Sequence, residues 1–442
     1  MSVGRFVVFF LVVSLLLGAS SFYVGRRAKQ AFGLGRRVEK SVIFVMIAAV
    51  GGMIVARVLE IKWLGQTVFT LLLAVLITTG LLLLADLLKL GLHVPLLLWN
   101  RRRDAAPAKA TEEKLINAEE VLKVSAAAVE KNDLATPMDP PPAAPEAENQ
   151  SDVANAPPLA STRRVFLGQA VTGSAMLVGS GSSVYGSLFG RHDFILEEVP
   201  MRIPGLSKRL DGYTLVQISD IHFGTYIGER EIRIAEELVR QAKPDRLVLT
   251  GDLLDSNPKY AEILGRFIRR MTPLARDGVV VIPGNHDWYA GVDIVMDAAR
   301  SAGARVLRND GFVVGDEKDG FALLGVEDVW AKRVDPRQFP DLEKAMSAVR
   351  ADLPRVLLCH NPVFFPEAAG KVALQLSGHT HGGQINIGPI RPGDVVLPYG
   401  YVQGRYERDG SQLYVNRGFG TAGPPARVGS PPEVTRVILV AG

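Results

Sequence analysis

The 442-residue sequence predicts an α/β domain over residues 191–442, preceded by an α-helical transmembrane bundle. The first supporting observation is uneven hydropathy, because most of the apolar excess lies before residue 100. The second is a change near residue 194, after which strand-length apolar runs alternate with segments of helical spacing. Continuous apolar runs that end in polar residues are typical of strands buried in a parallel sheet.

Three apolar runs predict a transmembrane region of three helices over residues 1–100. The runs are residues 6–24, 41–56 and 64–85, and their lengths approach or reach what a bilayer requires. The first run could instead be a cleaved signal peptide. Only Arg5 precedes its apolar part, and no clear A-x-A cleavage site follows, so a retained helix is favoured.

Basic residues predict the orientation of these helices. Six of them separate the first two runs, whereas the second and third runs are separated by only two; the six are Arg26, Arg27, Lys29, Arg36, Arg37 and Lys40. Loops rich in Lys and Arg stay in the cytoplasm. The N-terminus is therefore expected outside. The net charge of +4 is interpreted as this topology signal, and no nucleic-acid partner is expected.

The next segment, residues 101–162, is rich in Ala, Pro, Glu, Asn and Asp and predicts a disordered cytoplasmic linker. The chain contains one cysteine, Cys359, which excludes an internal disulfide framework. Because Cys359 lies in an apolar run, we interpret it as a small core residue.

Residues 163–190 predict either a fourth transmembrane helix or a twin-arginine-like export segment. The stretch "STRRVFL" resembles the twin-arginine pattern, which usually has lysine where Gly168 stands and usually lies at the N-terminus. Both alternatives place Arg163 inside and residue 190 outside, in agreement with the first three helices.

Residues with metal-binding side chains follow each predicted strand of the later part. The strands are 213–219, 246–250, 278–283 and 355–360; the residues are Asp220, His222, Asp252, Asp255, Asn285, His286, Asp287 and His360, and "SGHTHGGQ" adds His379 and His381. One such residue alone would be explained as a turn, a helix cap or a structural histidine. Together they would meet beyond the carboxyl ends of the strands, where buried carboxylates and imidazoles need a cation. The sequence therefore predicts a metal site.

These five blocks resemble the calcineurin-like metallophosphoesterases, specifically a membrane-anchored bacterial branch with a twin-arginine-like segment. The family pattern is D-x-H, G-D-x-x-D, G-N-H-D/E, a single H and G-H-x-H, and it is present here in that order within residues 213–440. The resemblance implies a four-layer αββα metallophosphoesterase sandwich and a hydrolase that acts on phosphoester bonds.

The resemblance also implies two divalent metal ions, which Mn, Fe or Zn would suit because the ligands are nitrogen and oxygen atoms. Asp220, His222 and His381 would hold the first ion, Asn285, His360 and His379 the second, and Asp252 both. Two such ions can share a hydroxide that attacks the phosphorus. The glycines beside His379 and His381 are expected to keep side chains out of the substrate space.

Other residues in or near these blocks are predicted to contact the substrate or to position a residue that does. By resemblance, His286 would contact the phosphate and protonate the leaving oxygen, and Asp255 would orient it; the alternative for Asp255 is a loop cap. Arg427 is expected to meet a phosphate. Trp288 and Tyr289 either line the substrate pocket or cover the core.

The sequence thus predicts a metallophosphoesterase in the cytoplasmic membrane with its catalytic domain outside. The substrate class stays open among phosphodiesters, monoesters and pyrophosphates; a lipid-linked substrate is expected because few residues separate Phe189 from Phe194. The alternative is a membrane protein whose outer domain binds a phosphate ligand without turnover. A nuclease ranks below both, since no basic–aromatic stripe is present. The oligomeric state is left open.

Overall fold

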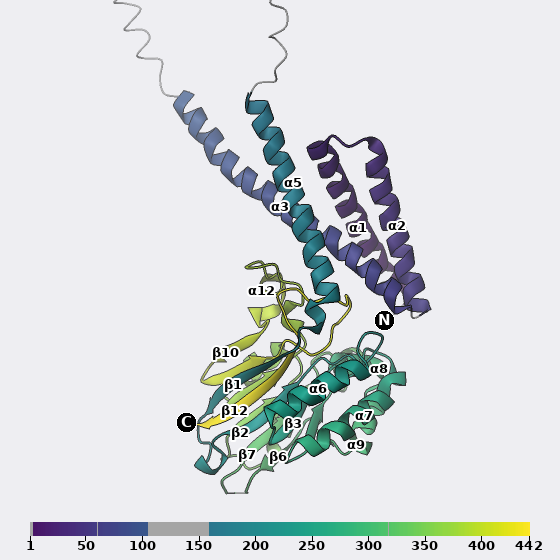
Figure 1. Cartoon of the computed structure of the whole chain (residues 1–442). Helices are drawn as coiled ribbons and strands as arrows, with labels where there is room; N and C mark the ends of the chain where they lie inside the picture. The colour runs from purple at the N-terminus through teal and green to yellow at the C-terminus, as the bar shows by residue number, and fades with distance from the viewer. Residues whose placement is uncertain (1–2, 60, 105–158, 317) are drawn as a thin grey trace, which may run out of the picture.

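A helical region precedes an α/β domain in the computed structural model (Figure 1), which describes residues 3–59, 61–104, 159–316 and 318–442. The helices are α1 (Val3–Phe32), α2 (Arg36–Val58), α3 (Lys62–Asp104) and α5 (Leu159–Leu188). Residues 105–158, most of the predicted linker, lie outside the described residues.

Helix α3 contains the segment best suited to cross a membrane. Among the described residues, Lys62–Gly91 is the one helical stretch whose length and composition meet that requirement, and α2 contains the shorter apolar stretch Lys40–Ala56. Helices are present at all four predicted spans. That each of them crosses a membrane stays a prediction.

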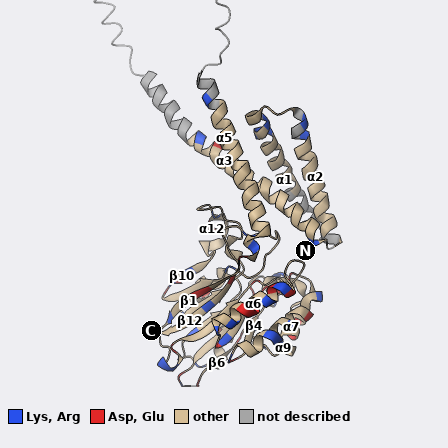
Figure 2. Ribbon diagram, viewed as in Figure 1, with Lys and Arg blue, Asp and Glu red and all other residues tan. Residues whose placement is uncertain are grey.

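Helices α3 and α5 pack against each other and run antiparallel. Gln66 Nε2 donates to the Ser187 carbonyl at 2.8 Å, and Ser183 Oγ donates to the Thr70 carbonyl at 2.6 Å. At the other end of the apolar part of α3, Tyr23 and Arg27 of α1 bond Asp86. The start of α3 and the end of α5 therefore lie next to the α/β domain, and the basic α1–α2 loop lies at the opposite end (Figure 2).

Two mixed six-stranded sheets form the α/β domain. In spatial order the first contains β1 (Ile195–Ile203), β12 (Glu433–Ala441), β2 (Tyr213–Ile218), β3 (Arg246–Thr250), β4 (Val279–Ile282) and β5 (Arg305–Val306); the second contains β10 (Gly404–Arg408), β11 (Ser411–Val415), β9 (Leu374–Ser377), β8 (Arg355–Leu358), β7 (Phe321–Gly325) and β6 (Asp310–Val314). Strands β2 to β5 are parallel, as are β7, β8, β9 and β11. The four predicted strands are confirmed as β2, β3, β4 and β8.

The central strands of each sheet are buried on both faces. Alternating residues of β2 show why: Leu215 points into the core between the sheets, and Val216 packs under helices on the outer face. The outer helices on the first sheet are α6 (Glu229–Ala242), α7 (Ala261–Met271) and α9 (Val292–Ser301), and α10 (Leu342–Ser347) and α11 (Phe365–Ala368) cover the second. Burial on both faces explains why these strands read as continuous apolar runs.

Candidate metal centre

The carboxyl ends of β2, β3, β4, β8 and β9 bring the seven predicted metal ligands together. Asp220 and His222 follow β2, Asp252 follows β3, Asn285 opens α8 (Asn285–Ala290) after β4, His360 follows β8, and His379 and His381 follow β9. Because the strands are parallel within each sheet, their carboxyl ends share one edge. All seven side chains are buried or nearly so.

The first group consists of Asp220, His222 and His381, whose potential ligand atoms lie within 4.8 Å of one another. The Nε2 atoms of His222 and His381 are 3.1 Å apart, and Asp220 Oδ1 lies 3.4 Å from His381 Nε2. Two neutral rings can share at most one proton across such a contact. A cation placed among these atoms would accept both nitrogen lone pairs and the carboxylate.

The second group consists of Asp252, His360 and His379. His379 Nδ1 lies 3.2 Å from His360 Nε2, which is 3.3 Å from Asp252 Oδ2. The same Asp252 oxygen lies 3.7 Å from His222 Nε2 in the first group. Asp252 therefore stands between the two groups, where one carboxylate can serve two cations.

Asn285 supplies an independent test of whether the site fits metal ions. Its Oδ1 atom is buried and has no hydrogen-bond partner among the residues that the structure describes. An unsatisfied buried acceptor costs about 1–3 kcal/mol, so a cation near this oxygen would remove a penalty. Asn285 also directly precedes His286, whose backbone N–H donates to Asp252 Oδ1 at 2.7 Å. The residues present therefore fit a pair of divalent cations.

Backbone strain is concentrated at this site. Five of the seven predicted ligands have positive φ angles: Asp220 (53°), His222 (52°), Asp252 (52°), His379 (70°) and His381 (52°). Non-glycine residues rarely adopt this region, and such strain persists where the surrounding structure over-determines it. The loops hold these side chains in one arrangement against local preference, as a preorganised site requires.

The glycine of "SGHTHGGQ" next to His379 has a different function from the one predicted. A Cβ atom on Gly378 would lie 1.9 Å from Ser219 Oγ and 2.3 Å from Asp220 Oδ2. Gly378 therefore allows the loop after β9 to approach the loop after β2, and the space that a side chain would fill is already occupied by protein. The prediction that it clears space for substrate is wrong for this glycine.

The buried charges prepare the ligands for metal binding. Burial lowers the pKa of His222 and of His379 to about 3, so both rings are neutral and have free lone pairs. Burial would also lower the pKa of His360, but the Asp252 carboxylate raises it well above the usual value. The pKa of Asp252 is correspondingly held low, since His360 outweighs the effect of burial. Without metal, His360 and Asp252 form an ion pair.

This ion pair predicts that metal uptake releases a proton. His360 must lose its proton to become a ligand, and its raised pKa means that the proton is still present at neutral pH. Burial raises the pKa of Asp220 to about 6, so a second proton competes as the pH falls through 6. Calorimetric titration of the full-length protein with Mn²⁺, in two buffers of different ionisation enthalpy, should show about one proton released at pH 7 and weaker binding at lower pH. Proton-independent binding would contradict this assignment.

His286 lies beside the first group but makes its hydrogen bond to a residue that the sequence analysis did not single out. Its Nδ1 atom is 2.8 Å from Ser256 Oγ, whereas Asp255 Oδ1 is 3.7 Å away, beyond hydrogen-bond distance. Ser256 thus contacts the imidazole directly, and Asp255 lies at ion-pair distance from it. His222, Asp255 and His286 also form a third group of potential ligand atoms within 4.8 Å.

Arg427 does not meet a phosphate, contrary to expectation. Its side chain is buried and donates to the carbonyls of Arg417, Gly418, Gly420 and Ser430 at 2.8–3.2 Å. One guanidinium nitrogen also lies 3.2 Å from His381 Nδ1. Arg427 therefore ties the segment that follows β11 around His381.

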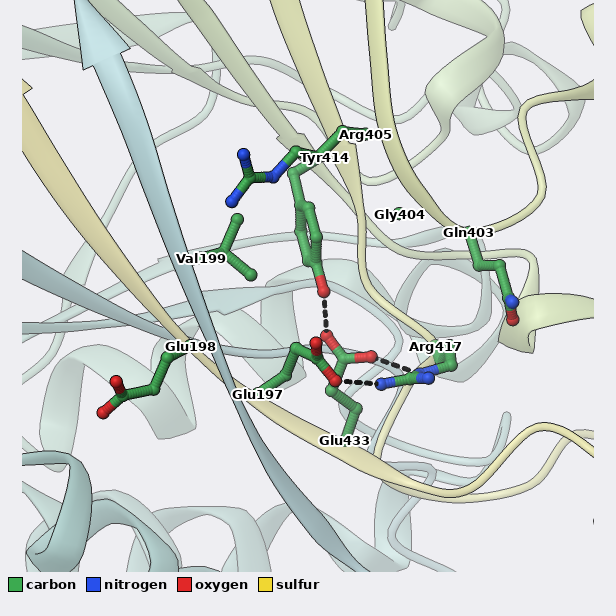
Figure 3. A pocket seen from close by; sticks show the side chains of 9 residues that line it. All are labelled: Glu197, Glu198, Val199, Gln403, Gly404, Arg405, Tyr414, Arg417 and Glu433. Atoms are coloured by element: carbon green, nitrogen blue, oxygen red, sulfur yellow. Dashed lines mark hydrogen bonds and ion pairs between the residues drawn. The ribbon is translucent and has the colours of Figure 1, made fainter.

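A polar pocket beside β1 and β10 (Figure 3) is lined by side chains that hold the same segment in place. Buried Glu433 accepts hydrogen bonds from Tyr414 Oη at 2.6 Å and from Arg417 Nε at 2.5 Å, and Arg417 also pairs with Glu197 at 2.8 Å. The pocket contains none of the predicted site residues. Within it, Glu197 and Glu433 both pair with Arg417, and they fix the backbone of Arg417 that Arg427 bonds.

Two further carboxylates lie near the site, and the sequence position of each, directly after a motif residue or after a strand, marks it. Asp287, which follows His286, accepts from the backbone N–H groups of Leu253, Leu254 and Gly284 at 2.9–3.1 Å and thereby joins the loops after β3 and β4. Asp328 follows β7, the parallel neighbour of β8, and one of its buried oxygens has no partner within the described residues. The strand-end argument that found His360 applies equally to Asp328.

The structure also decides three minor assignments. Cys359 is fully buried in the core under α10 and α11, as predicted. Trp288 covers the core and donates from Nε1 to Glu327 at 3.1 Å. Tyr289 remains 43% exposed and its ring lies 5.6 Å from that of His286, so only Tyr289 is available to line a substrate path.

Comparison with known proteins identifies the family. The profile described as calcineurin-like phosphoesterase matches residues 213–383. An uncharacterized metallophosphoesterase of Aquifex aeolicus (strain VF5) is 32% identical over 228 residues, covering 51% of this chain and 84% of that protein. The uncharacterized metallophosphoesterase YkuE of Bacillus subtilis (strain 168) is 30% identical over 294 residues, covering 62% and 96%. This chain therefore belongs to the calcineurin-like phosphoesterase family and is a hydrolase of phosphoester bonds.

A relative from an animal is similar over a comparable length. A Danio rerio protein described as a transmembrane protein with metallophosphoesterase domain is 30% identical over 274 residues, covering 60% of this chain and 62% of that protein. The family resemblance and the enzyme class predicted from the motifs are confirmed. Since relatives occur in both bacteria and animals, the similarity does not single out a bacterial branch.

Proposed function

We propose that this protein is a dimetal phosphoesterase anchored in the cytoplasmic membrane, with its active site outside and directed at a phosphoester at the membrane surface. The observation that carries the proposal is the direct connection between α5 and the metal centre. The backbone N–H of Arg427 donates to the Gly186 carbonyl in the last turn of α5 at 3.0 Å, while its guanidinium lies against His381. The end of the fourth predicted span thus touches the segment that surrounds a predicted metal ligand.

The residues of the site would divide the chemistry between them. Asp220, His222 and His381 would hold one divalent ion, Asn285, His360 and His379 the other, and Asp252 would bridge them; the ions, when bound, would supply an activated water and neutralise phosphoryl charge. His286 would act as the general acid. If its Nδ1 accepts from the Ser256 hydroxyl, the ring proton is on Nε2, where it can pass to the leaving oxygen.

The proposed orientation rests on where the basic residues lie. The basic α1–α2 loop and the start of α5, the end of the helix that contains Arg163, lie away from the α/β domain (Figure 2), so the positive-inside rule favours a domain outside. A reporter fused after residue 442 is expected to behave as exported, and one inserted near residue 130 as cytoplasmic. Protease protection in membrane vesicles would check the result, and a cytoplasmic C-terminus would overturn the orientation.

The contacts of α5 favour a retained membrane helix over a cleaved twin-arginine signal. Ser183 and Ser187 are buried against α3, and a Cβ atom on Gly179 would lie 2.2 Å from Thr78 Oγ1. Packing this close supports a helix that is retained in the mature protein. Changing Arg163 and Arg164 together to lysine would block export if the twin-arginine pathway were used, and we expect export to continue.

The short connection between α5 and the domain supports a substrate at the membrane surface. Only residues 189–194 separate α5 from β1, and half of them form the compact turn Gly190–His192. The fully extended chain would span about 3.3–3.6 Å per residue, so the domain stays close to the lipid. The relative described as a transmembrane protein supports the same anchoring.

The full-length enzyme in liposomes is therefore expected to prefer a long-chain lipid phosphoester to a short-chain soluble ester with the same headgroup. Confinement to one surface raises the effective concentration, so kcat/KM should differ by about tenfold or more. Dilution of enzyme and substrates into detergent should remove the preference. Equal rates on both esters in liposomes would refute the lipid-linked substrate while leaving phosphoester hydrolysis intact.

The alternative of binding without turnover has its own test. The purified chain with Mn²⁺ is assayed against a chromogenic phosphodiester, a monoester and a pyrophosphate, with and without EDTA. Hydrolysis that EDTA abolishes supports the enzyme, as the complete ligand set leads us to expect. Tight metal binding with no turnover on any phosphoester would favour the alternative.

A further inference from the structure

A short loop next to the metal centre exposes an unusual amount of apolar surface. Residues 385–400, here called the α12 loop, contain the helix α12 (Gly393–Val396). Val395 is 88% exposed, Val396 78% and Tyr399 63%. Exposed apolar groups of this size in one segment are typical of an interaction surface.

The same loop already contacts the apolar helix α3. Ile385 and Ile387 pack against a cluster of Leu73, Ile77 and Ala426, and Leu73 and Ile77 lie inside the candidate span Lys62–Gly91. At 1.5 Å per residue, Leu73 is about 16 Å along the helix from Lys62, so this contact lies well inside the apolar stretch. In Figure 1, α12 is at the end of the domain that faces α3 and α5. The loop that exposes these side chains therefore also packs on a candidate membrane helix.

The charges of the α12 loop are also compatible with lipid. Its sequence, "INIGPIRPGDVVLPYG", has only two charged residues, Arg391 and Asp394. These two pair with each other at 2.8 Å, so neither charge would meet the headgroup region alone. Tyr399 is the residue type that prefers the boundary between lipid and water.

We propose that the α12 loop inserts its apolar side chains into the outer leaflet of the bilayer beside α3. The occupant of this surface is lipid, because the loop is continuous with the face of α3 that lipid would surround. The inference rests on the membrane anchoring proposed above and adds a second contact, made by the catalytic domain itself.

Insertion at this place would bring lipid to the edge of the metal centre. The loop begins four residues after the predicted ligand His381, and Asn386 Nδ2 donates to the Gly382 carbonyl at 2.9 Å. A phosphoester in the leaflet would then lie near the site without leaving the membrane. The loop thus defines the side from which a lipid substrate would enter.

Site-specific labelling of the full-length protein tests the proposal without using activity. Cys359 is the only cysteine and is fully buried, so single cysteines introduced elsewhere can carry an environment-sensitive fluorophore. The test variant is Val395→Cys. Ile294→Cys on α9, 54% exposed, is the control for water, and Leu76→Cys, 45% exposed within α3, is the control for the bilayer.

Each labelled protein is placed in liposomes and exposed to aqueous iodide or to phospholipid with a nitroxide near the head of its acyl chain. We expect the label at Val395 to shift to shorter emission wavelength, to be quenched by the nitroxide lipid and to lose quenching by iodide, whereas the label at Ile294 behaves oppositely. Circular dichroism and metal content of each variant should match those of the unlabelled protein.

The controls separate the possible failures. Lipid quenching at Leu76 with iodide quenching at Val395 overturns the insertion of the loop and leaves the anchoring intact. Shielding of Val395 from both quenchers means that protein, such as a second copy of the chain, covers the loop, which also overturns the proposal. Iodide quenching at Leu76 itself shows that α3 is outside the bilayer, and the proposal fails together with the anchoring.

Discussion

Replacing Asp252 by asparagine is expected to remove both metal ions and the hydrolytic activity together. One Asp252 oxygen lies 3.3 Å from His360 Nε2 and 3.7 Å from His222 Nε2, so it belongs to both groups of ligands. A neutral amide would bind two divalent cations far more weakly than a carboxylate does. We expect the metal content to fall from about two ions per chain to near zero, because each proposed ion shares this carboxylate, with a loss in kcat/KM of about 10³ or more, which corresponds to about 4 kcal/mol.

The asparagine substitution removes the negative charge of Asp252 and keeps nearly the same side-chain shape. The amide oxygen can still accept from the His286 backbone N–H, which now bonds Asp252 Oδ1. Asp293→Asn, at an exposed carboxylate that pairs with Arg308 on the surface, should change neither metal content nor rate. Metal content is measured by elemental analysis and rate with a chromogenic phosphodiester. A variant that keeps one ion firmly bound would show that Asp252 does not bridge.

The sequence predicted which candidate ligands lie together at this site because their positions depend on a simple geometric rule. Asp220, Asp252, Asn285 and His360 each follow a buried strand, and parallel strands in one sheet end at the same edge. Their residue types then limit the chemistry to metal binding. Asp328 follows the same rule after β7 and was missed because it stands outside the family pattern.

Contacts between loops could not be predicted from the positions of strand ends. Arg427 turns inward to four carbonyls, and Ser256 instead of Asp255 bonds His286, because those directions depend on how several loops pack on one another. Gly378 was assigned to open space for a similar reason, since its contact with Ser219 joins segments far apart in the chain. Sequence periodicity contains no information about such distant pairs.

The helical region shows the same division between local and distant features. Apolar runs and basic residues predicted where helices lie, because length and hydropathy are local properties. The packing of Ile387 against the cluster that contains Leu73 and Ile77 joins residues that are far apart in sequence and lie in different parts of the molecule. It links a loop of the α/β domain to a candidate membrane helix, and only the folded structure brings these two segments together.

Replacing His286 by alanine is expected to keep both metal ions and to lower kcat by about 10²–10⁴, the usual contribution of a general acid. The ring stands beside the first group of ligands, 4.7 Å from the ring of His222, and belongs to neither half of the predicted ligand set. Metal content near two ions per chain with a large loss of rate would support this division of roles. If the variant instead lost its metals, His286 would have to be a ligand, as the third group formed with His222 and Asp255 allows.

The leaving group distinguishes a proton donor from a residue that only shapes the site. A nitrophenolate leaves readily without a proton, whereas an alkoxide does not, so His286→Ala should slow an alkyl phosphoester much more than a nitrophenyl ester. Ser256→Ala keeps the imidazole and removes one hydrogen bond of about 1 kcal/mol, so it should cost tenfold or less, about the factor that 1.4 kcal/mol represents. Equal losses on both esters would mean that His286 supports the site and does not donate the proton.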